Sequence, residues 1–438
     1  MPHEIAVVGG GPKAAAIAAK AAVLKRDYPN SPNITIFEPA AIGSAWSGLN
    51  GYTDGEQLLC TLAERDVGFP YSRHTFGAST ARRMASDFSW QSYCVSLGSG
   101  DYRYDTWVDK GRRPPIHKCY ADYLSWVVRK SSASVVNGRV EHIQPYPAQG
   151  GWRVIVTDSN GLQPHPQLFS GIVITGSGPS LPALNGITSG QKHRVFDGKT
   201  FWQRPQDVIN LLKLKNSSVA ILGAGGTAAA IAAWFNRVGF RHVPITIVGR
   251  ETTLYTRARG YFEDRMFSDD VAWTALPEHA RQTFTERLTT GAVWEYVVDQ
   301  LSSNKNILYK SAEIVEFVHY PQGGYNDLAV KLSDVPAPNA QSGSAVTTST
   351  TLLNADVYVD ARGFDAWWFF SLMPMSAPSP QIKRSILSGM DEALAIPPVV
   401  VGHENFHVPS LANIQGPAAS NLMALGWMAD RVLGRYLP

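Results

Sequence analysis

Short apolar runs alternate with a longer alanine-rich run at the start of the chain. Residues 4–8 and 34–37 are largely apolar, and the segment between them opens with glycines at 9–11 and continues as an alanine-rich stretch to about Leu24. A short apolar run that ends in glycines is typical of a buried strand, and a longer alanine-rich run favours a helix. This pattern predicts a strand–helix–strand unit with a glycine turn after the first strand.

The same order returns in the middle of the chain. Residues 219–222 are apolar, glycines and small residues follow at 223–228, an alanine-rich stretch covers 229–238, and 245–248 is apolar again. This repeated pattern predicts two nucleotide-binding halves with the same order of strands and helix.

A block of shorter apolar runs follows each unit, at 135–178 and at 307–363. In both blocks a Gly-Gly pair, at 150–151 and at 323–324, precedes a strand pattern, and the last apolar run ends at a glycine. These features predict a β-meander that leads into a further strand. Residues 336–351 are rich in Ser, Thr, Pro and Ala and predict a surface loop.

The first glycine turn has the spacing Gly9-x-Gly11-x-x-Ala14. The first glycine of such a turn allows a tight bend, the second lets a pyrophosphate approach the backbone, and the third small residue lets the helix pack on the strand. The amino end of the helix then presents its partial positive charge to the phosphates. Glu38 ends the second strand and is placed to accept hydrogen bonds from ribose hydroxyls.

The second turn, Gly223-x-Gly225-x-Thr227-Ala228, repeats this spacing. Its second strand ends at Arg250 rather than at an acid. An acid there would repel a 2′-phosphate, whereas an arginine can pair with it, so NADPH is expected rather than NADH. Two fingerprints in one chain, the first at its very start, predict FAD in the first half and NADPH in the second.

We therefore predict an α/β fold with two Rossmann-like dinucleotide-binding domains, β-meander appendages and a small helical substrate region. The predicted boundaries are residues 1–185 for the first part of the FAD-binding domain, 195–260 for the NADPH-binding domain, 261–305 for the helical substrate-binding region, and 306–438 for the sheet and C-terminal part that completes the FAD-binding domain. A chain of 438 residues is too long for one simple core, which agrees with several packed units.

Composition and charge exclude other classes of partner. Hydrophobic residues make up 44% of the chain and charged residues 17%, which suits a globular enzyme. The net charge is only +3 and no long Lys/Arg block occurs, so neither nucleic acid nor a membrane surface is expected as a partner. No apolar run has the length of a membrane span and no signal peptide is evident, so we expect a cytoplasmic protein.

The three cysteines, Cys60, Cys94 and Cys119, form no Cys-x-x-Cys pair. A sparse, odd set of cysteines fits buried thiols in a reducing compartment. Flavin-dependent disulfide reductases need a close pair of redox cysteines, so this branch of the flavoproteins is excluded.

One motif matches a zinc site by its letters only. His403 to His407 spells H-E-x-x-H, which binds zinc when both histidines lie on one face of a helix. Residues 397–402 predict a strand and a turn, and Pro409 follows, so a helix is not expected and no metal is predicted.

The last part of the chain contains a candidate flavin contact. Residues 415–420 precede a predicted helix at 421–433, whose amino end would stabilise negative charge on a reduced flavin. Gln415 and Gly416 are therefore candidate cofactor contacts. The alternative is an ordinary C-terminal packing helix.

Motifs spread over nearly the whole chain match one family. The most specific are Asp66-Val-Gly-Phe-Pro-Tyr71 and Gly260-Tyr-Phe-Glu263 with Phe267-Ser-Asp269. More general matches are Gly9–Ala14 with its Pro12 and Lys13, Trp46, Gly223–Ala228 and Gln415–Pro417. In these pieces the chain resembles the flavin-dependent N-hydroxylating monooxygenases that act on lysine or ornithine, most closely the mycobactin-type lysine N6-hydroxylases.

The resemblance implies a reaction in siderophore or other natural-product biosynthesis. NADPH reduces FAD, O2 forms a C4a-hydroperoxyflavin, and a neutral side-chain amine attacks its distal oxygen. The protein then has to exclude water and hold the amine close, which requires no acid–base triad, so no catalytic residue is assigned. The resemblance also implies cofactor contacts at Pro12, Lys13 and Trp46. The expected partners are a small amine and O2; a homo-oligomer is left open.

Two departures from the family pattern concern the substrate. The family has Lys-Asp where this chain has Arg65-Asp66, and that lysine holds the substrate carboxylate. The family has Asn where this chain has Asp264, and that asparagine contacts the amino-acid end. We therefore assign Arg65 to a carboxylate and Asp264 to an α-ammonium, with L-lysine as first substrate and ornithine or a related amine or diamine next. Alternatively, Arg65 and Asp66 form a local ion pair.

Two rival classes stay open at this point. A Baeyer–Villiger or S-oxygenating flavin monooxygenase would show Phe-x-Gly-x-x-x-His-x-x-x-Trp/Tyr between its fingerprints, and residues 195–202 lack that histidine spacing. A non-catalytic nucleotide-binding redox protein is disfavoured by two intact fingerprints.

Overall fold

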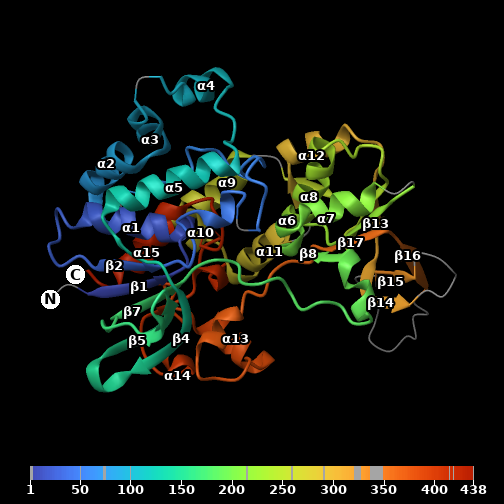
Figure 1. Cartoon of the computed structure of the whole chain (residues 1–438). Helices are drawn as coiled ribbons and strands as arrows, with labels where there is room; N and C mark the ends of the chain where they lie inside the picture. Colours follow the sequence, from blue (N-terminus) through green and yellow to red (C-terminus); the bar gives the residue numbers. More distant parts are fainter. Residues whose placement is uncertain are drawn as a thin grey trace.

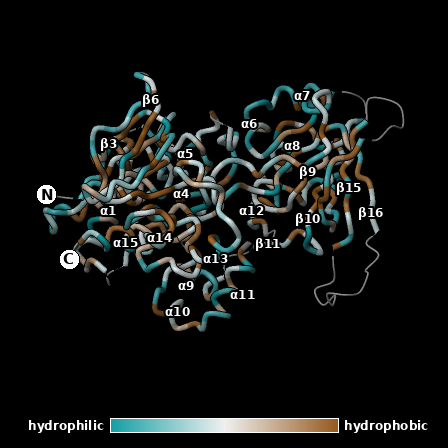
Figure 2. Tube along the Cα trace, turned by 90° about the horizontal axis from the view of Figure 1, so that it is seen from below, coloured by the Kyte–Doolittle hydropathy of each residue, from teal (hydrophilic) through white to brown (hydrophobic). Residues whose placement is uncertain are grey.

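The chain folds into two halves that lie side by side, each around its own sheet (Figure 1). The computed structural model describes residues 3–49, 51–72, 75–98, 100–213, 216–257, 260–289, 292–319, 327–335, 349–413, 415–417 and 419–437. Figure 2 shows the same two halves from below, with hydrophobic residues along their inner strands and helices.

The first half is built on a parallel sheet with the strand order β18-β7-β1-β2-β3. At its centre β1 (Glu4–Val8) pairs with β2 (Asn33–Phe37) and with β7 (Gly171–Ile174). The edges are β3 (Ser134–Val136) and β18 (Phe406–His407). All four residues of β7 are buried, as expected for a parallel sheet that is covered on both faces.

Three helices of the first half pack together on its sheet. Helix α1 (Pro12–Leu24) contacts α5 (His117–Ser131) and α15 (Leu425–Gly434). The alanines of α1 are almost all buried, because short side chains let the helix lie close to its neighbours. An antiparallel sheet of β4 (Arg139–Tyr146), β5 (Gly151–Asp158) and β6 (Gly161–Pro164) lies next to β7, which β5 contacts; Figure 1 labels β4 and β5 beside β7.

The second half repeats the design with the strand order β13-β10-β9-β17-β8. Strand β9 (Val219–Leu222) pairs in parallel with β10 (Ile245–Gly249) and β17 (Val357–Asp360). The edges are β13 (Ile307–Ser311) and β8 (Val195–Asp197). Other elements of this half are α6 (Thr200–Gln203), α7 (Pro205–Leu212), α8 (Gly226–Arg237), α12 (Glu295–Ser302), and the antiparallel β14 (Glu313–His319), β15 (Leu328–Ser333) and β16 (Thr350–Asn354).

Helices from the middle of the chain connect the two halves. In α9 (Tyr261–Ser268), α10 (Asp270–Thr274) and α11 (Glu278–Thr289), the side chains of Phe267 and Trp273 meet Phe284 with ring centroids 5.8 and 5.6 Å apart. Phe267 and Phe284 belong to the hydrophobic core of the first half, whereas α12 packs on α8 in the second. The range 261–305 therefore reaches both nucleotide-binding units.

The remaining elements lie around these two cores. They are α2 (Gly77–Phe88), α3 (Trp90–Ser96), α4 (Arg103–Asp109), α13 (Pro380–Gly389), α14 (Pro398–Val401), the parallel pair β11 (Tyr255–Arg257) and β12 (Ala292–Trp294), and the 3-10 helices Ser44–Trp46, Pro147–Gln149, Ser189–Arg194, Trp368–Leu372 and Pro409–Leu411. Among the residues that the structure describes, no helix has both the length and the apolar character needed to cross a membrane.

The predicted fold class is confirmed, but two local predictions are wrong. Strands β13 and β17 lie in the range 306–438, which was predicted to complete the first domain, yet both belong to the second sheet. The hydrogen-bonding groups along β9 and β10 require partners, and strand patterning does not tell which sheet a later strand will join. The predicted strand at 397–402 is instead the short helix α14, which ends at Val401 and is followed by Gly402 with a positive φ of 87°.

The predicted loop at 336–351 is only partly described. Residues 336–348 lie outside the described residues, as does the Gly-Gly pair at 323–324, and Thr350 and Thr351 belong to β16. The hairpin predicted at the Gly-Gly pair 150–151 is present: residues 147–150 join β4 to β5, and Gly151 is the first residue of β5.

A buried ion pair joins the first helix to the last. Lys20 Nζ of α1 lies 2.5 Å from Asp430 Oδ1 of α15, and the two side chains are 2% and 6% exposed. Burial raises the pKa of the Asp430 carboxyl, and the neighbouring Lys20 opposes that rise. A buried charge left without its partner costs far more than a solvated one.

We expect Lys20→Met to lower the free energy of unfolding by about 3–5 kcal/mol, because Asp430 would remain buried without a counter-charge. Urea denaturation of the FAD-loaded protein measures this change. The double variant Lys20→Met/Asp430→Leu is the control and should recover most of the loss. A loss below about 1 kcal/mol in the single variant would contradict a buried pair.

Candidate functional site

The first glycine turn leaves the amino end of α1 open. Gly9 has a φ of +100°, and a Cβ added there would lie 2.7 Å from Thr175 Oγ1. Gly11 caps α1 without any side-chain hydrogen bond, and a Cβ on Gly11 would meet no heavy atom within 4 Å. Pro12 follows as the first helical residue, and Ala14 is fully buried. The turn thus fits a pyrophosphate at the helix amino end.

Glu38 lies beside this turn, as its place at the end of β2 predicts. Its carboxylate accepts hydrogen bonds from the backbone N–H of Gly10 at 2.8 Å and of Ala40 at 3.1 Å, and from Ser44 Oγ at 3.4 Å. A carboxylate offers about four lone-pair sites, so capacity remains for a ribose hydroxyl. The residues present therefore fit the adenosine end of FAD.

Trp46 lies in an aromatic group next to the turn. Its ring meets those of His117 and Tyr120 edge-on, with centroids 4.7 and 5.8 Å apart. The Tyr120 hydroxyl is buried and has no hydrogen-bond partner among the described residues. Burial lowers the pKa of His117 to about 4, so this wall of the site is uncharged near neutral pH.

Lys13 connects the first turn to the end of the chain. Its Nζ donates to the backbone oxygen of Ser420 at 3.2 Å, and burial lowers the pKa of its ammonium to about 8. In the same segment Gln415 Nε2 donates to the Met390 oxygen at 2.7 Å, and a Cβ on Gly416 would lie 2.4 Å from the ring of Trp427. The segment that holds Gln415 and Gly416 therefore borders the first fingerprint.

The predicted helix at 421–433 begins later than expected. Asn421 forms a turn instead, because its side chain donates to the Pro417 oxygen and accepts from the Met423 N–H. Helix α15 starts at Leu425, and the Gly426 N–H donates to the Phe69 oxygen at 2.7 Å. The amino end of α15 is thus covered by the loop around Phe69.

The second glycine turn has the same open geometry as the first. Gly223 has a φ of +119°, and a Cβ there would lie 2.4 Å from the Ala361 backbone oxygen. Gly225 caps α8 without a side-chain hydrogen bond, and a Cβ on it would meet no heavy atom within 4 Å. Thr227 and the buried Ala228 lie in the first turn of α8. This turn fits the pyrophosphate of a second dinucleotide.

Arg250 lies directly after β10, at the same edge of the sheet as this turn. Its side chain is exposed, and within the described residues no hydrogen bond or ion pair engages it. The guanidinium is therefore available to pair with a 2′-phosphate.

Arg65 and Asp264 are brought together, although two hundred residues separate them in the sequence. Arg65 Nη2 lies 3.0 Å from Asp264 Oδ2, with the two side chains 10% and 21% exposed. Arg65 Nη1 also donates to the Met423 oxygen at 3.0 Å, and its guanidinium lies 4.9 Å from the centroid of the Phe69 ring. The two residues predicted to bind opposite ends of an amino-acid head group are thus neighbours.

Asp66 has a different role from its neighbour Arg65. Its carboxylate accepts hydrogen bonds from the N–H groups of Gly68 and Trp90 and from the Tyr71 hydroxyl, at 3.0, 2.9 and 2.7 Å. Burial raises the pKa of Asp66 to about 6, although these donors oppose the rise. Asp66 therefore orders the loop that carries Arg65.

A cavity of about 200 Å³ lies between these segments. This volume is enough for a small side chain and far too little for a dinucleotide. It is lined by Cys60, Arg257, Thr285, Leu288, Trp294, Asn413, Ser420, Asn421, Leu422 and Met423. Ser420 connects the cavity to Lys13 of the first fingerprint, and Met423 connects it to Arg65.

Arg257 is the charged residue that sequence reasoning missed. Its Nε lies 3.1 Å from Glu263 Oε1, and its guanidinium lies 5.0 and 4.8 Å from the ring centroids of Phe267 and Trp294. It ends the short strand β11, and none of the motifs of the sequence analysis includes it. Burial raises the pKa of Cys60 to about 11, so the thiol in the same cavity stays protonated.

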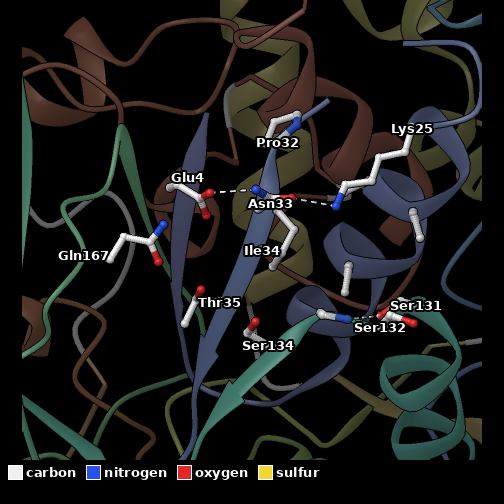
Figure 3. Close-up of a pocket in the computed structure, with 14 residues that line it drawn as sticks. Glu4, Lys25, Pro32, Asn33, Ile34, Thr35, Ser131, Ser132, Ser134 and Gln167 are labelled. Carbon is white, nitrogen blue, oxygen red and sulfur yellow. Dashed lines mark hydrogen bonds between the residues drawn. The ribbon is translucent and has the colours of Figure 1, made fainter. Parts of the chain in front are cut away.

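A second cavity, of about 230 Å³, lies at the opposite, amino ends of β1 and β2 (Figure 3). There Lys25 Nζ donates to Asn33 Oδ1 at 2.7 Å, and Asn33 Nδ2 donates to Glu4 Oε1 at 2.6 Å. Ligands of open parallel sheets bind at the carboxyl ends of the strands, so this cavity belongs to neither fingerprint.

The H-E-x-x-H letters do not fall on one helix. Helix α14 ends at Val401, and His407 lies in β18 with its Nδ1 2.7 Å from the Ala393 oxygen and its Nε2 2.7 Å from the Tyr436 hydroxyl. Both ring nitrogens of His407 are therefore engaged within the fold. In the part of the chain that the structure describes, no group of His, Cys, Asp or Glu side chains could hold a metal ion.

Comparison with known proteins identifies relatives of the whole chain. The family described as L-lysine 6-monooxygenase/L-ornithine 5-monooxygenase matches residues 78–310. The L-lysine N6-monooxygenase MbtG of Mycobacterium sp. (strain MCS) is 31% identical over 451 residues, covering 100% of this chain and 96% of MbtG.

Solved structures agree with these sequence matches. The lysine monooxygenase NbtG of Nocardia farcinica is 29% identical, with a TM-score of 0.76 over 99% of this chain and 100% of NbtG. The ornithine N-hydroxylase KtzI of Kutzneria sp. 744, described with reduced FAD, NADP+ and L-ornithine, has a TM-score of 0.72 over 100% of this chain and 99% of KtzI; at 17% identity it shares the fold.

We expect Gly11→Val to weaken flavin binding without unfolding the protein. Gly11 has φ −89° and ψ −166°, which valine adopts readily, and its Cβ would contact no protein atom, so the new side chain would occupy only the space for the pyrophosphate. FAD should bind at least about tenfold more weakly, as measured by flavin absorbance after gel filtration. Gly225→Val is the matched control and should leave flavin content unchanged. Full flavin occupancy in Gly11→Val would contradict the assignment of FAD to the first glycine turn.

Arg250→Ala should raise the KM for NADPH about tenfold and leave the KM for NADH unchanged. A charge-assisted pair contributes about 1.5–3 kcal/mol, and we expect the lower end because Arg250 is exposed. Steady-state cofactor oxidation by the FAD-loaded enzyme measures both constants. Equal changes for the two cofactors would mean that Arg250 does not contact the 2′-phosphate.

Proposed function

This chain belongs to the L-lysine 6-monooxygenase/L-ornithine 5-monooxygenase family and is an FAD- and NADPH-dependent N-monooxygenase of an amino-acid side chain; from this premise we propose that its substrate is L-lysine, hydroxylated at N6. The support for lysine is that the full-length relatives MbtG and NbtG are named as lysine monooxygenases. These relatives disfavour a Baeyer–Villiger or S-oxygenating enzyme and a non-catalytic redox protein. The proposed role is siderophore biosynthesis, in the cytoplasm, where NADPH and the free thiols would stay reduced.

The observation that carries the proposal is the Arg65–Asp264 pair. An α-amino acid presents a carboxylate and an ammonium on neighbouring atoms, and this pair presents the two complementary charges 3.0 Å apart. We propose that the carboxylate binds beside Arg65 and the α-ammonium beside Asp264. A diamine would offer Arg65 only a cation, so the pair favours an amino acid.

The cavity next to this pair supplies the conditions that amine oxidation needs. Bound FAD, once reduced by NADPH, supplies the activated oxygen, and the amine attacks only when it is neutral. Leu288, Trp294 and Leu422 give the cavity an apolar wall, which disfavours a charged ammonium. The residues of this chain therefore position and desolvate the amine, and no acid–base pair is required of them.

We expect Arg65→Ala to reduce kcat/KM for L-lysine at least about 30-fold, equivalent to about 2 kcal/mol, because the substrate carboxylate would lose its partner. The same variant should change kcat/KM for cadaverine, the matching diamine, by less than about threefold. Asp264→Asn should reduce kcat/KM for L-lysine by a comparable factor. Hydroxylamine product and substrate-dependent NADPH oxidation are the two measurements.

Ornithine and putrescine form a second matched pair of substrates. If wild-type enzyme prefers a diamine, or if both variants keep the full yield from L-lysine, the proposed substrate end is wrong. Flavin content of each variant excludes loss of the cofactor as a cause.

A further inference from the structure

Two polar side chains of the cavity each have an atom that lacks a hydrogen-bond partner in the described part of the chain. Arg257 Nη2 and Thr285 Oγ1 are buried atoms without a hydrogen bond among the described residues, and both residues line the cavity. A buried polar group without a partner is destabilising, and a buried charged group without one is more so. Two such groups around one small cavity indicate that a ligand completes their hydrogen bonds.

We propose that Arg257 and Thr285 form a subsite that binds the α-carboxylate of the substrate from inside the cavity. A guanidinium N–H and a hydroxyl are the donors that a carboxylate oxygen accepts, and the guanidinium charge repels an ammonium. This inference rests on the proposed amino-acid substrate and adds two residues to its recognition.

The fold holds Arg257 in place while leaving one nitrogen open. Glu263 binds its Nε, and the rings of Phe267 and Trp294 lie against the guanidinium, so the side chain stays ordered without the ligand. Burial lowers the pKa of Arg257 and its acidic neighbours Glu263 and Asp264 oppose that change. Arginine remains charged in proteins, so the subsite keeps its positive charge.

Thr285 and Arg257 reach the cavity from different elements. Thr285 lies one turn before Leu288 on the same face of α11, and both line the cavity, whereas Arg257 ends β11. Two donors on separate elements define a direction for the bound group, which a single arginine would not.

The subsite is compatible with the role proposed for Arg65. Asp264 pairs with Arg65 and also raises the pKa of Arg257, so the two guanidinium groups share an acidic neighbour. A carboxylate has about four lone-pair sites and can accept from Arg65 on one side and from Arg257 and Thr285 on the other. The site then discriminates against diamines through two cationic side chains, Arg65 and Arg257, instead of one.

The test compares three ligands of the FAD-loaded enzyme: L-lysine, 6-aminohexanoate, which lacks the α-amine, and cadaverine, which lacks the carboxylate. We expect Arg257→Gln to raise the KM for L-lysine about 10–100-fold, with kcat at saturation within about threefold of wild type. Thermal stabilisation by 6-aminohexanoate should be lost to the same degree, and the response to cadaverine should not change.

Thr285→Val is the second variant, because it removes only the hydroxyl from a residue of equal size. It should raise the KM for L-lysine about 3–10-fold and leave the KM for cadaverine unchanged. Arg287→Gln is the matched control. Arg287 also pairs with Glu263, at 3.3 Å, but its side chain is 76% exposed and does not line the cavity. The KM for L-lysine and the thermal stabilisation by 6-aminohexanoate and cadaverine should therefore equal those of the wild type.

The outcomes separate the subsite from the proposed function. An equal loss for L-lysine and cadaverine in Arg257→Gln, or the same loss in Arg287→Gln, would overturn the subsite and indicate a structural effect through Glu263. If the wild-type enzyme oxidises cadaverine better than L-lysine, the proposed substrate is wrong. In that case stabilisation by 6-aminohexanoate that disappears in Arg257→Gln still supports a carboxylate subsite, and its persistence overturns it.

Discussion

The close approach of helix and strand at the two glycine turns is the constraint on which the rest of the site depends. A side chain at Gly9 would meet Thr175, and one at Gly223 would meet the backbone of Ala361, each directly after the neighbouring strand of its sheet. Only glycine allows this approach, and both residues adopt positive φ values that favour it. As a result, the amino ends of α1 and α8 open at the carboxyl edges of their sheets, where the helix dipole would favour the pyrophosphate of a bound dinucleotide.

The substrate end is assembled from segments that lie far apart in the chain. The loop around Arg65 is ordered by Asp66, the helix α9 supplies Asp264, the helix α11 supplies Thr285, and the segment before α15 closes the cavity. Lys13 ties that last segment back to the first fingerprint through Ser420. The cavity therefore lies against the half that carries the first fingerprint, so an amine bound there as proposed would be close to bound FAD.

Charges around this cavity are arranged in a chain of alternating sign. Arg65 faces Asp264, and Arg257 faces Glu263, which in turn faces the exposed Arg287. Buried charges are tolerated only when they are paired, so each arginine near the cavity has an acid that holds it in the absence of ligand. An amino-acid head group fits such an arrangement because it carries both signs itself.

The sequence by itself determined the local elements of both nucleotide-binding units. The glycine spacing at 9–14 and 223–228, the apolar strands and the alanine-rich helices were sufficient for both nucleotide-binding units, because these features depend on local backbone geometry and on burial of a strand. The sequence did not determine that β13 and β17 join the second sheet, that α15 begins at Leu425, or that Arg257 faces a cavity. Strand partners, the covered end of a helix and an unpartnered guanidinium are properties of contacts between distant segments, and only the tertiary structure decides them.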